Sequence, residues 1–570
     1  MIQPLPSSLQ VLQSAARLLQ AGRPGEALPL LRNLTTAAPT SPDAHRLLGL
    51  ALRDLGDTNG AEATLRAAHR LAPGSAPTAY ALCELLRAAG RSEEALAVIA
   101  PLADRPDADL HLLTAKGEAL KALDHLGEAE TAFSRAAAVA PASAVAEHNL
   151  GAVLGDLERF GESEAAARRA LAKGGDAPET WLVLARALLG QGRNAEAEGA
   201  YRAVIAGRPD DVEAQGELAQ LIWMLTDDVA VASVELDAAI ARFPANLGLR
   251  LKKGFLLQTG GDLDAAYGAV EGVLDRAEAE PMMHVIAARF SLWRHPQRAL
   301  RHARDGVALL PNDPVAQSTL AEAYLATGDP AAALRIAERM HAAAPLDQQA
   351  LGTLATCWRL LDDPRYGRLY DYDHFVRTWR IDTPEGWPDL EAFLADLKVA
   401  LERRHTLRTH PVGQSVRHGS QTSQRLTVVD DPVIKAFFKA VDGPIRRHIE
   451  ALGAGEDPLR SRRTGGYEFN GEWSVRLRES GYHAGHLHPR GWLSSACYIS
   501  LPSAVERDGH EGWLQFGEPG VPTSPALPAE HFIKPEPGLL ALFPSYMWHG
   551  TVPFSGDEAR LTIAFDVIPA

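Results

Sequence analysis

The stretch from residue 178 to residue 209, PETWLVLARALLGQGRNAEAEGAYRAVIAGRP, decides how the first two thirds of the chain fold. Trp181 lies on the predicted inner face of one helix, and Gly192 allows a tight turn after it. In the next helix Ala197 permits a close helix crossing, and Pro209 ends that helix. The stretch therefore predicts two antiparallel helices joined by a short turn.

The same pattern recurs along the chain at a regular spacing. Prolines occur at 39, 73, 106, 141, 209, 244, 311 and 345, so they are separated by a nearly constant step or by twice that step. The step matches the period of about 34 residues that is typical of tetratricopeptide repeats, which the chain resembles over about ten units between positions 8 and 345. We therefore predict an all-α tetratricopeptide-repeat solenoid over residues 1–346, with a unit near Thr226 that lacks the turn glycine.

A solenoid of this kind offers a long concave groove. Such grooves commonly take an extended peptide or protein segment, so a protein or peptide partner is expected. A scaffold or dimerisation surface is the alternative. The repeats themselves supply no chemistry, and the oligomeric state is left open.

Composition and charge limit the class of protein. The 570 residues are 46% hydrophobic and 23% charged, which indicates folded domains rather than disorder. The net charge is −15, and residues 401–570 carry 18 Lys/Arg against 19 Asp/Glu, so nearly all of the excess lies before residue 401. An acidic first section argues against a nucleic-acid partner.

The three cysteines are Cys83, Cys357 and Cys497, and no CxxC pair occurs. This spacing excludes a disulfide framework and a thiolate zinc site. The N-terminus has no basic leader and the chain has no run of about 18 apolar residues, so no membrane contact and a cytoplasmic location are expected.

The character of the sequence changes after Pro345. Residues 347–404 contain Pro388 followed by DLEAFLADLKVAL, an amphipathic helical pattern, and are predicted to be a helical connector that caps the array. DPVIKAFFKAV and IRRHIEAL, which follow, predict a helix pair broken at Gly443-Pro444.

From about residue 470 the hydrophobic period becomes two. Short segments separated by turn residues predict six strands: SVRLRE (474–479), WLSSACYISL (492–501), WLQF (513–516), GLLALF (538–543), HGTVPF (549–554) and ARLTIAFDV (559–567). Many short strands without helices between them predict a β-sandwich or small barrel. We expect this domain, with its helical flank, to span residues 405–570.

Three histidines stand out in these strands. In GYHAGHLHPRGW (481–492), His486 and His488 are two residues apart, so both side chains leave the same face of an extended strand. His549 opens a later strand. Three imidazoles can converge on iron, zinc or another transition metal. The alternative is that they are ordinary histidines satisfied by hydrogen bonds.

Arg560 follows His549 by eleven residues. Strand alternation places Arg560, Thr562, Ala564 and Asp566 on one face, toward the interior of the barrel, and the apolar residues between them on the other. A buried guanidinium needs an anionic partner, and a small carboxylate ligand held by Arg560 with Thr562 beside it would meet that need. The alternative is a salt bridge from Arg560 to Asp566 or Glu558.

With these residues in view, the C-terminal part resembles the 2-oxoglutarate and iron(II)-dependent oxygenases, which have a double-stranded β-helix (jelly-roll) fold. The resemblance is carried by HPVGQSVRHGSQT (410–422), HLHPRGWLSSACYISLP (486–502) and LFPSYMWHGTVPFSGDEARLTIAFDV (542–567). The whole chain resembles tetratricopeptide-repeat proteins that carry such a domain. The resemblance implies Fe(II), 2-oxoglutarate and O₂ as reactants, and hydroxylation of a C–H bond.

Carried over to this sequence, the resemblance makes His486 and His549 metal ligands and Arg560 the partner of the distal 2-oxoglutarate carboxylate, assisted by Thr562. It adds Tyr498 as a cosubstrate contact, with a tyrosine of the core as the alternative, and Gln421 and Thr422 as pocket residues. His488 is the departure, because the superfamily usually has Asp or Glu as its third ligand. With histidine there, either three histidines hold the metal or His488 turns away.

Three functions are therefore weighed. The first is a dioxygenase that hydroxylates a protein or peptide presented by the repeats. The second is a repeat scaffold whose β-domain binds metal structurally or not at all. The third is a three-histidine zinc enzyme, which the Arg560 and Thr562 pair disfavours because zinc hydration chemistry needs no dicarboxylate clamp.

Overall fold

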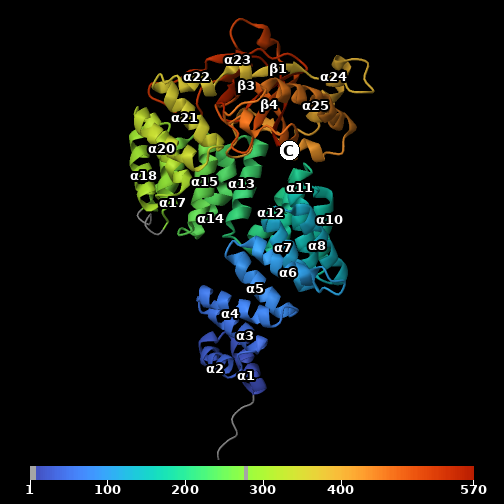
Figure 1. Cartoon of the computed structure of the whole chain (residues 1–570). Helices are drawn as coiled ribbons and strands as arrows, with labels where there is room; N and C mark the ends of the chain where they lie inside the picture. The colour runs from blue at the N-terminus through green and yellow to red at the C-terminus, as the bar shows by residue number, and fades with distance from the viewer. Residues whose placement is uncertain (1–7, 275–279) are drawn as a thin grey trace, which may run out of the picture. The chain divides into compact units, whose positions relative to one another are not determined.

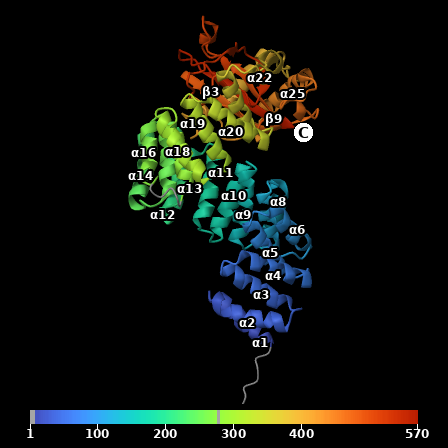
Figure 2. The same cartoon turned by 60° about the vertical axis from the view of Figure 1, so that its left-hand side comes forward.

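The computed structural model describes residues 8–274 and 280–570, and the chain divides into two compact units, Met1–Leu188 and Leu189–Ala570. In each unit the helices follow one another as antiparallel pairs (Figure 1, Figure 2). None of the helices in the described ranges has the length and apolar content needed to cross a membrane.

The described residues of the first unit, 8–188, form helices joined by short turns. Its helices are α1 (Ser8–Gln20), α2 (Pro24–Ala37), α3 (Pro42–Asp54), α4 (Thr58–Leu71), α5 (Ala76–Ala88), α6 (Ser92–Ala103), α7 (Leu110–Ala122), α8 (Leu126–Val139), α9 (Ala144–Asp156), α10 (Phe160–Ala172) and α11 (Pro178–Gly190), the last of which ends just past the boundary. Small residues let the paired helices approach: a Cβ on Gly49 would lie 2.6 Å from Leu65, and one on Gly117 would lie 2.6 Å from Phe133. In both pairs the glycine precedes its large partner by the same interval along the chain, so the sequence repeat is also a repeat in packing.

The turns inside the repeats follow the predicted period even where glycine is absent. Ten of these turns contain a left-handed residue: Gly22, Gly56, Gly90, Asp124, Glu158, Gly192, Asp227, Gly261, Gly328 and Asp362. The described turn between α17 (Met282–Ser291) and α18 (Pro296–Leu309) has none. The unit near Thr226 keeps its turn because Asp227, with φ 61°, replaces the glycine. Asp tolerates this conformation better than most residues, since its short side chain can bond locally.

The second unit continues the helix pairs and ends in the β-domain. Its helices are α12 (Asn194–Gly207), α13 (Val212–Thr226), α14 (Val229–Arg242), α15 (Leu247–Thr259), α16 (Leu263–Glu271), α17 (Met282–Ser291), α18 (Pro296–Leu309), α19 (Pro314–Ala326), α20 (Pro330–Ala343), α21 (Gln348–Leu360), α22 (Arg365–Leu369), α23 (Tyr372–Phe375), α24 (Leu390–Glu402) and α25 (Pro432–Leu452). Short 3-10 turns cover Leu426–Val428, Arg460–Arg462 and Ser503–Glu506.

The β-domain consists of two antiparallel sheets, as the jelly-roll expectation requires. The larger sheet has the order β1-β7-β4-β9-β3-β2 and the smaller one β6-β5-β8. The strands are β1 (Arg377–Arg380), β2 (Val416–Gln421), β3 (Tyr467–His483), β4 (Leu493–Ser500), β5 (Leu514–Phe516), β6 (His531–Ile533), β7 (Leu539–Pro544), β8 (His549–Thr551) and β9 (Arg560–Pro569). All six predicted strands are present. β1 comes from the segment 347–404, which the sequence predicted as purely helical, and it adds an edge strand beside β7.

One prediction about the flanking helices is wrong. Helix α25 is continuous, although the sequence predicted a break at Gly443-Pro444. Pro444 has no N–H, which would leave the carbonyl of Ala440 without its helical donor. The backbone N–H of Asp382, just after β1, donates to that carbonyl at 3.1 Å and so repairs the gap. Phe437 of the same helix packs against the core face of the larger sheet.

Residues 405–414, which we call the docking segment, attach the β-domain to the repeats of the same unit. The backbone N–H groups of Arg408 and Thr409 donate to the carbonyl of Met224 at 2.8 and 3.0 Å. Trp223 Nε1 donates to the carbonyl of His410 at 2.9 Å. The docking segment is therefore held by the end of α13.

A second attachment lies at α21. The indole Nε1 of Trp548 donates to the carbonyl of Gly352 at 3.2 Å and to Thr356 Oγ1 at 3.0 Å. Gly352 is needed there because a Cβ on it would lie 2.5 Å from Leu487. Residue Leu487 separates the two histidines of the HxH motif, so the repeats touch the back of the site.

Candidate metal centre and cavity

The HxH motif lies where the chain leaves β3 and meets β8. His486 and His549 form an antiparallel bridge in which each backbone N–H donates to the other residue's carbonyl at 3.0 Å. The extended backbone turns His486 and His488 to one side, while Leu487 points into the core with 8% of its surface exposed. The segment that follows β3 and the first residue of β8 thus bring three imidazoles together.

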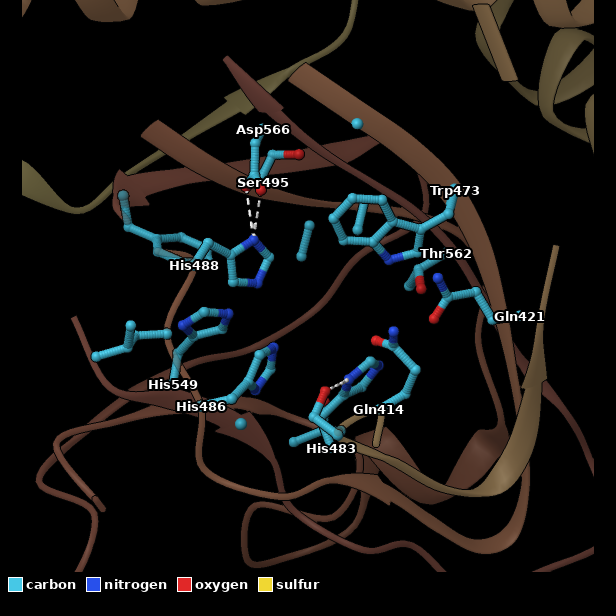
Figure 3. Close-up of a pocket in the computed structure, with 18 of the residues that line it drawn as sticks. Gln414, Gln421, Trp473, His483, His486, His488, Ser495, His549, Thr562 and Asp566 are labelled. Atoms are coloured by element: carbon cyan, nitrogen blue, oxygen red, sulfur yellow. Dashed lines mark hydrogen bonds and ion pairs between the residues drawn. The ribbon is translucent and has the colours of Figure 1, made fainter. Parts of the chain in front are cut away.

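Figure 3 shows the imidazoles of His486, His488 and His549 turned toward one another. Their potential ligand nitrogens all lie within 4.8 Å of one another. The Nδ1 atoms of His486 and His549 contact the carbonyls of Ala484 and Met547, both at 2.9 Å. A carbonyl can only accept, so these Nδ1 atoms carry the proton and the Nε2 atoms keep a free lone pair. That is the tautomer a metal ligand requires.

Burial keeps two of these imidazoles neutral. Desolvation lowers the pKa of His486 to about 3, and the neighbouring His488 contributes to the lowering. Burial also holds the pKa of His549 well below its usual value. Neutral imidazoles need not lose a proton before they bind a cation. The donor set and its protonation therefore fit a divalent transition metal.

His488 is oriented differently from the other two. Its Nδ1 lies 2.7 Å from both carboxylate oxygens of Asp566. On the other side, the ring of Trp473 stacks on it with a centroid separation of 5.8 Å and an interplanar angle of 29°. The prediction left open whether His488 turns toward the other two histidines or away; it turns toward them.

Arg560 lines the same cavity from strand β9 and is only 2% exposed. Its Nε donates to the carbonyl of Gly512 at 3.1 Å, and its Cζ lies 5.1 Å from the centroid of the Tyr498 ring. Burial lowers the pKa of the guanidinium. Among the described residues no carboxylate lies within salt-bridge distance of it, so a buried cation faces the cavity without an anion.

The alternative salt bridges predicted for Arg560 are absent from the described structure. Asp566 accepts hydrogen bonds from His488 and Ser494, at 2.7 Å in both cases. Glu558 accepts from the backbone N–H of Ser503 at 2.6 Å. Both carboxylates are therefore engaged elsewhere.

A cavity of about 520 Å³ joins the histidines and the arginine. The predicted alternation of β9 is confirmed: Arg560, Thr562, Ala564 and Asp566 line the cavity, and the apolar residues between them belong to the core. Only one carboxylate, Asp566, is among the described residues that line it. The cavity thus offers histidine nitrogens at one place and a guanidinium at another.

Comparison with protein families decides the class of this domain. Residues 471–566 match the model of the family described as "Putative 2OG-Fe(II) oxygenase". Tetratricopeptide-repeat models match residues 148–212 and 182–246, 18–69 and 52–117, and 314–339. The chain is a tetratricopeptide-repeat protein with a 2OG-Fe(II) oxygenase domain. No curated protein matches it.

Solved structures are similar to parts of this oxygenase-domain protein. Yeast Tom70 is 10% identical with a TM-score of 0.37, covering 70% of this chain and 96% of its own. MamA 41-end from Desulfovibrio magneticus RS-1 is 21% identical with a TM-score of 0.26, covering 30% and 93%. YrrB, titled a TPR protein with an unusual peptide-binding site, is 14% identical with a TM-score of 0.29, covering 32% and 95%.

The oxygenase domain places the remaining predicted residues as follows. Thr562 and Gln421 line the cavity. Thr422 is not among the described residues that line it; its hydroxyl accepts from the backbone N–H of Ser474 at 3.1 Å. Tyr498 is fully buried next to Arg560, outside the described lining, and burial raises the pKa of its hydroxyl to about 12. Its contact with a cosubstrate stays a prediction.

Sequence reasoning missed several cavity residues of the oxygenase domain, among them His483 and Gln414. His483 stacks on His486 with a centroid separation of 5.6 Å and is bonded through Nδ1 to Ser415 Oγ at 3.1 Å. Gln414, at the end of the docking segment, also lines the cavity (Figure 3). The third histidine of GYHAGHLH was a visible signal for His483. No pattern in the sequence pointed to Gln414.

Proposed function

We propose that the chain is an Fe(II)- and 2-oxoglutarate-dependent dioxygenase that hydroxylates a protein or peptide held by its repeats. One observation carries the proposal: three imidazoles with converging nitrogens share a cavity with a buried guanidinium that has no carboxylate partner among the described residues. A dicarboxylate cosubstrate satisfies both requirements, because one end can chelate a metal while the other pairs with Arg560.

His486, His488 and His549 would hold the metal. When bound, ferrous iron supplies the redox chemistry that couples decarboxylation of 2-oxoglutarate and reduction of O₂ to oxidation of a C–H bond. One oxygen atom enters the substrate, and the other enters succinate as CO₂ is lost.

Arg560 would orient the cosubstrate. Its Nε is already bound to Gly512, which fixes the plane of the guanidinium before any ligand arrives. The terminal nitrogens can then present a paired set of donors to a carboxylate. Thr562, one step along the same face of β9, offers a hydroxyl beside them.

The first test is an anaerobic titration of the full chain with Fe(II) and 2-oxoglutarate. The expected result is a weak metal-to-ligand charge-transfer band in the visible range. Arg560→Ala should lose the band at the same cosubstrate concentration while it still binds the metal. Arg403→Ala, which removes an exposed arginine at the end of α24, is the matched control and should keep the band.

The outcomes separate the candidate functions. A band that survives in Arg560→Ala would contradict the cosubstrate assignment. Binding of iron without any band would remove the support for an oxygenase and favour the zinc enzyme, which metal analysis after anaerobic purification would then identify. No metal binding at all would favour the repeat scaffold.

The substrate class rests on the repeats. Solenoids of this kind bind extended polypeptides along their concave face, which favours a protein or peptide over a metabolite. Succinate formation should therefore rise when the macromolecular fraction retained by dialysis of a cell extract is added. Protease treatment of that fraction should abolish the increase. Stimulation by the diffusible fraction alone would contradict a polypeptide substrate.

A further inference from the structure

The oxygenase superfamily usually has a carboxylate as its third metal ligand, and this chain has His488 there. Three imidazoles leave the ligand set without negative charge. The cavity nevertheless contains one carboxylate among its described lining residues, that of Asp566. It lies on the side of the His488 ring that is turned away from His486 and His549 (Figure 3).

Asp566 is held on more than one side. Both of its oxygens are 2.7 Å from His488 Nδ1, and Ser494 Oγ donates to Oδ1 at 2.7 Å. Ser494 is in turn 2.9 Å from Ser545 Oγ. Only 6% of Asp566 is exposed. A buried carboxylate with fixed partners holds the imidazole in one orientation and in one tautomer.

The backbone around His488 is shaped for this contact. The N–H of His488 donates to the carbonyl of Ser545 at 2.9 Å, and the N–H of Gly491 donates back to the carbonyl of His488 at 3.2 Å. A Cβ on Gly491 would lie 2.2 Å from Ser545 Oγ and 3.4 Å from Asp566 Cγ. Glycine at 491 therefore lets the turn after HxH close over the carboxylate.

We propose that Asp566 is the positioning residue of the metal centre: it fixes the Nε2 atom of His488 toward the other two histidines and supplies, from behind the ligand, the negative charge that the ligand set lacks. The inference rests on the metal centre of the proposed function. A carboxylate bonded to a ligating histidine raises the basicity of that imidazole, and losing it typically weakens metal binding about 10- to 100-fold.

The placement also ties the metal end of the cavity to the cosubstrate end. Asp566 and Arg560 lie on the same face of β9, with Thr562 and Ala564 between them. The strand therefore carries both the anion that orients a metal ligand and the cation that awaits a carboxylate. Shifting its register by one residue would remove both from the cavity.

The test uses Co(II) as the probe and the full chain as the protein. The visible ligand-field spectrum of bound Co(II) reports the ligand set, and competition with a chelating dye gives the affinity of the protein for Co(II). Asp566→Asn should bind Co(II) about 10- to 100-fold more weakly than wild type. Asp508→Asn, an exposed carboxylate in a loop of the same domain, is the matched control and should bind as wild type does.

A double-mutant cycle separates positioning from a general structural role. If Asp566 acts through His488, then Asp566→Asn should change the affinity less than about two-fold in a His488→Ala background. An equal loss in both backgrounds would overturn the proposal. Wild-type affinity in Asp566→Asn would also overturn it, and so would wild-type affinity in His488→Ala.

A milder variant keeps the test valid if Asp566→Asn does not fold. Ser494→Ala retains the carboxylate and removes one of its donors, so it should weaken Co(II) binding about three-fold and shift the ligand-field bands in the same direction. Thermal unfolding of each metal-free variant shows whether the fold is intact. If the wild-type protein binds Co(II) but shows no charge-transfer band with Fe(II) and 2-oxoglutarate, the proposed function is contradicted. The role of Asp566 in metal binding is then still supported by the Co(II) affinities.

Discussion

The repeats of the first unit and the oxygenase domain are stabilised in opposite ways. In the repeats one contact recurs: a small residue on one helix admits a large one on the next, as with Gly49 and Leu65 and again with Gly117 and Phe133. In the oxygenase domain each contact around the cavity occurs only once, as does the hydrogen bond between His488 and Asp566. We therefore expect the loss of one repeat contact to be shared among neighbouring repeats, and the loss of one cavity contact to change the binding properties of the cavity.

The largest expected effect follows from removing a ligand in the domain. His549→Ala should weaken binding of Fe(II) or Co(II) by at least about 100-fold, the upper end of what an outer-shell change costs, and should abolish succinate formation. His531→Ala is the matched control, since His531 stacks on Tyr372 at 4.8 Å and is not among the described residues that line the cavity. Turnover that persists in His549→Ala would contradict the ligand assignment.

A smaller effect is expected when the buried cation is changed but kept. Arg560→Lys preserves the charge and loses both the paired donors and the bond to Gly512. We expect the KM for 2-oxoglutarate to rise about 10-fold, which corresponds to about 1.4 kcal/mol, with Co(II) affinity unchanged. Arg403→Lys provides the comparison. An unchanged KM would show that Arg560 meets no carboxylate.

Acid should weaken the helical flank of the domain through His448. His448 of α25 is fully buried, and its Nδ1 accepts from Trp379 Nε1 at 3.2 Å. Burial lowers its pKa to about 3, against about 6.5 in an unfolded chain, so the unfolded state takes up the proton first. The stability it contributes is complete above about pH 6.5 and falls by about 1.4 kcal/mol per pH unit below that value.

The ion pairs of the repeats respond at lower pH than His448 does. Hydrogen bonds from Arg66 and Arg91 lower the pKa of Glu62, so its contribution is retained until the pH falls below the ordinary value of 4.5. Seven of the ten tryptophans lie beyond residue 350, so tryptophan fluorescence mainly reports the oxygenase domain and the segment before it, while far-UV circular dichroism is dominated by the helices. Between pH 7 and pH 5, the free energy of unfolding measured by tryptophan fluorescence should fall by about 2 kcal/mol more in wild type than in His448→Phe. Equal falls would contradict this assignment.

The smallest functional effect is expected in the repeats. Gly117→Ala places a Cβ 2.6 Å from Phe133, so it should destabilise the first unit by about 1–3 kcal/mol. Co(II) affinity and succinate formation should stay within about two-fold of wild type. Gly127→Ala is the control, because Gly127 is a helical glycine with open space around it; this change should alter neither the stability of the first unit nor the activity. A loss of activity in Gly117→Ala would show that the two regions are coupled.

The periodic region was predictable because its signal is repeated. The regular spacing of the prolines set the register of the turns, and the structure keeps that register even where Asp227 replaces glycine. The alternation along β9 was equally predictable, because successive residues from Arg560 to Val567 belong in turn to the cavity lining and to the core. The domain limits at residues 346 and 404 stay predictions.

What could not be predicted depends on contacts between distant segments. Asp566 lies far along the chain from His488, and only the packing of β9 beside β4 brings them together. The continuity of α25 through Pro444 depends on the N–H of Asp382, which belongs to a much earlier segment, and no local pattern contains it. Such single contacts leave no period in the sequence, so propensity and spacing cannot reveal them.

The contacts of the docking segment and of Trp548 determine whether the oxygenase domain can be separated from the repeats in evolution or in engineering. The sequence pattern alone predicts a separable domain that begins near residue 405. A fragment cut there would lose the edge strand β1, the carbonyl of Met224 that anchors the docking segment, and the partners of the Trp548 indole. It would expose apolar side chains that the last repeats now cover. We expect the domain to be recombined only together with the repeats from α13 onward, as one heritable piece.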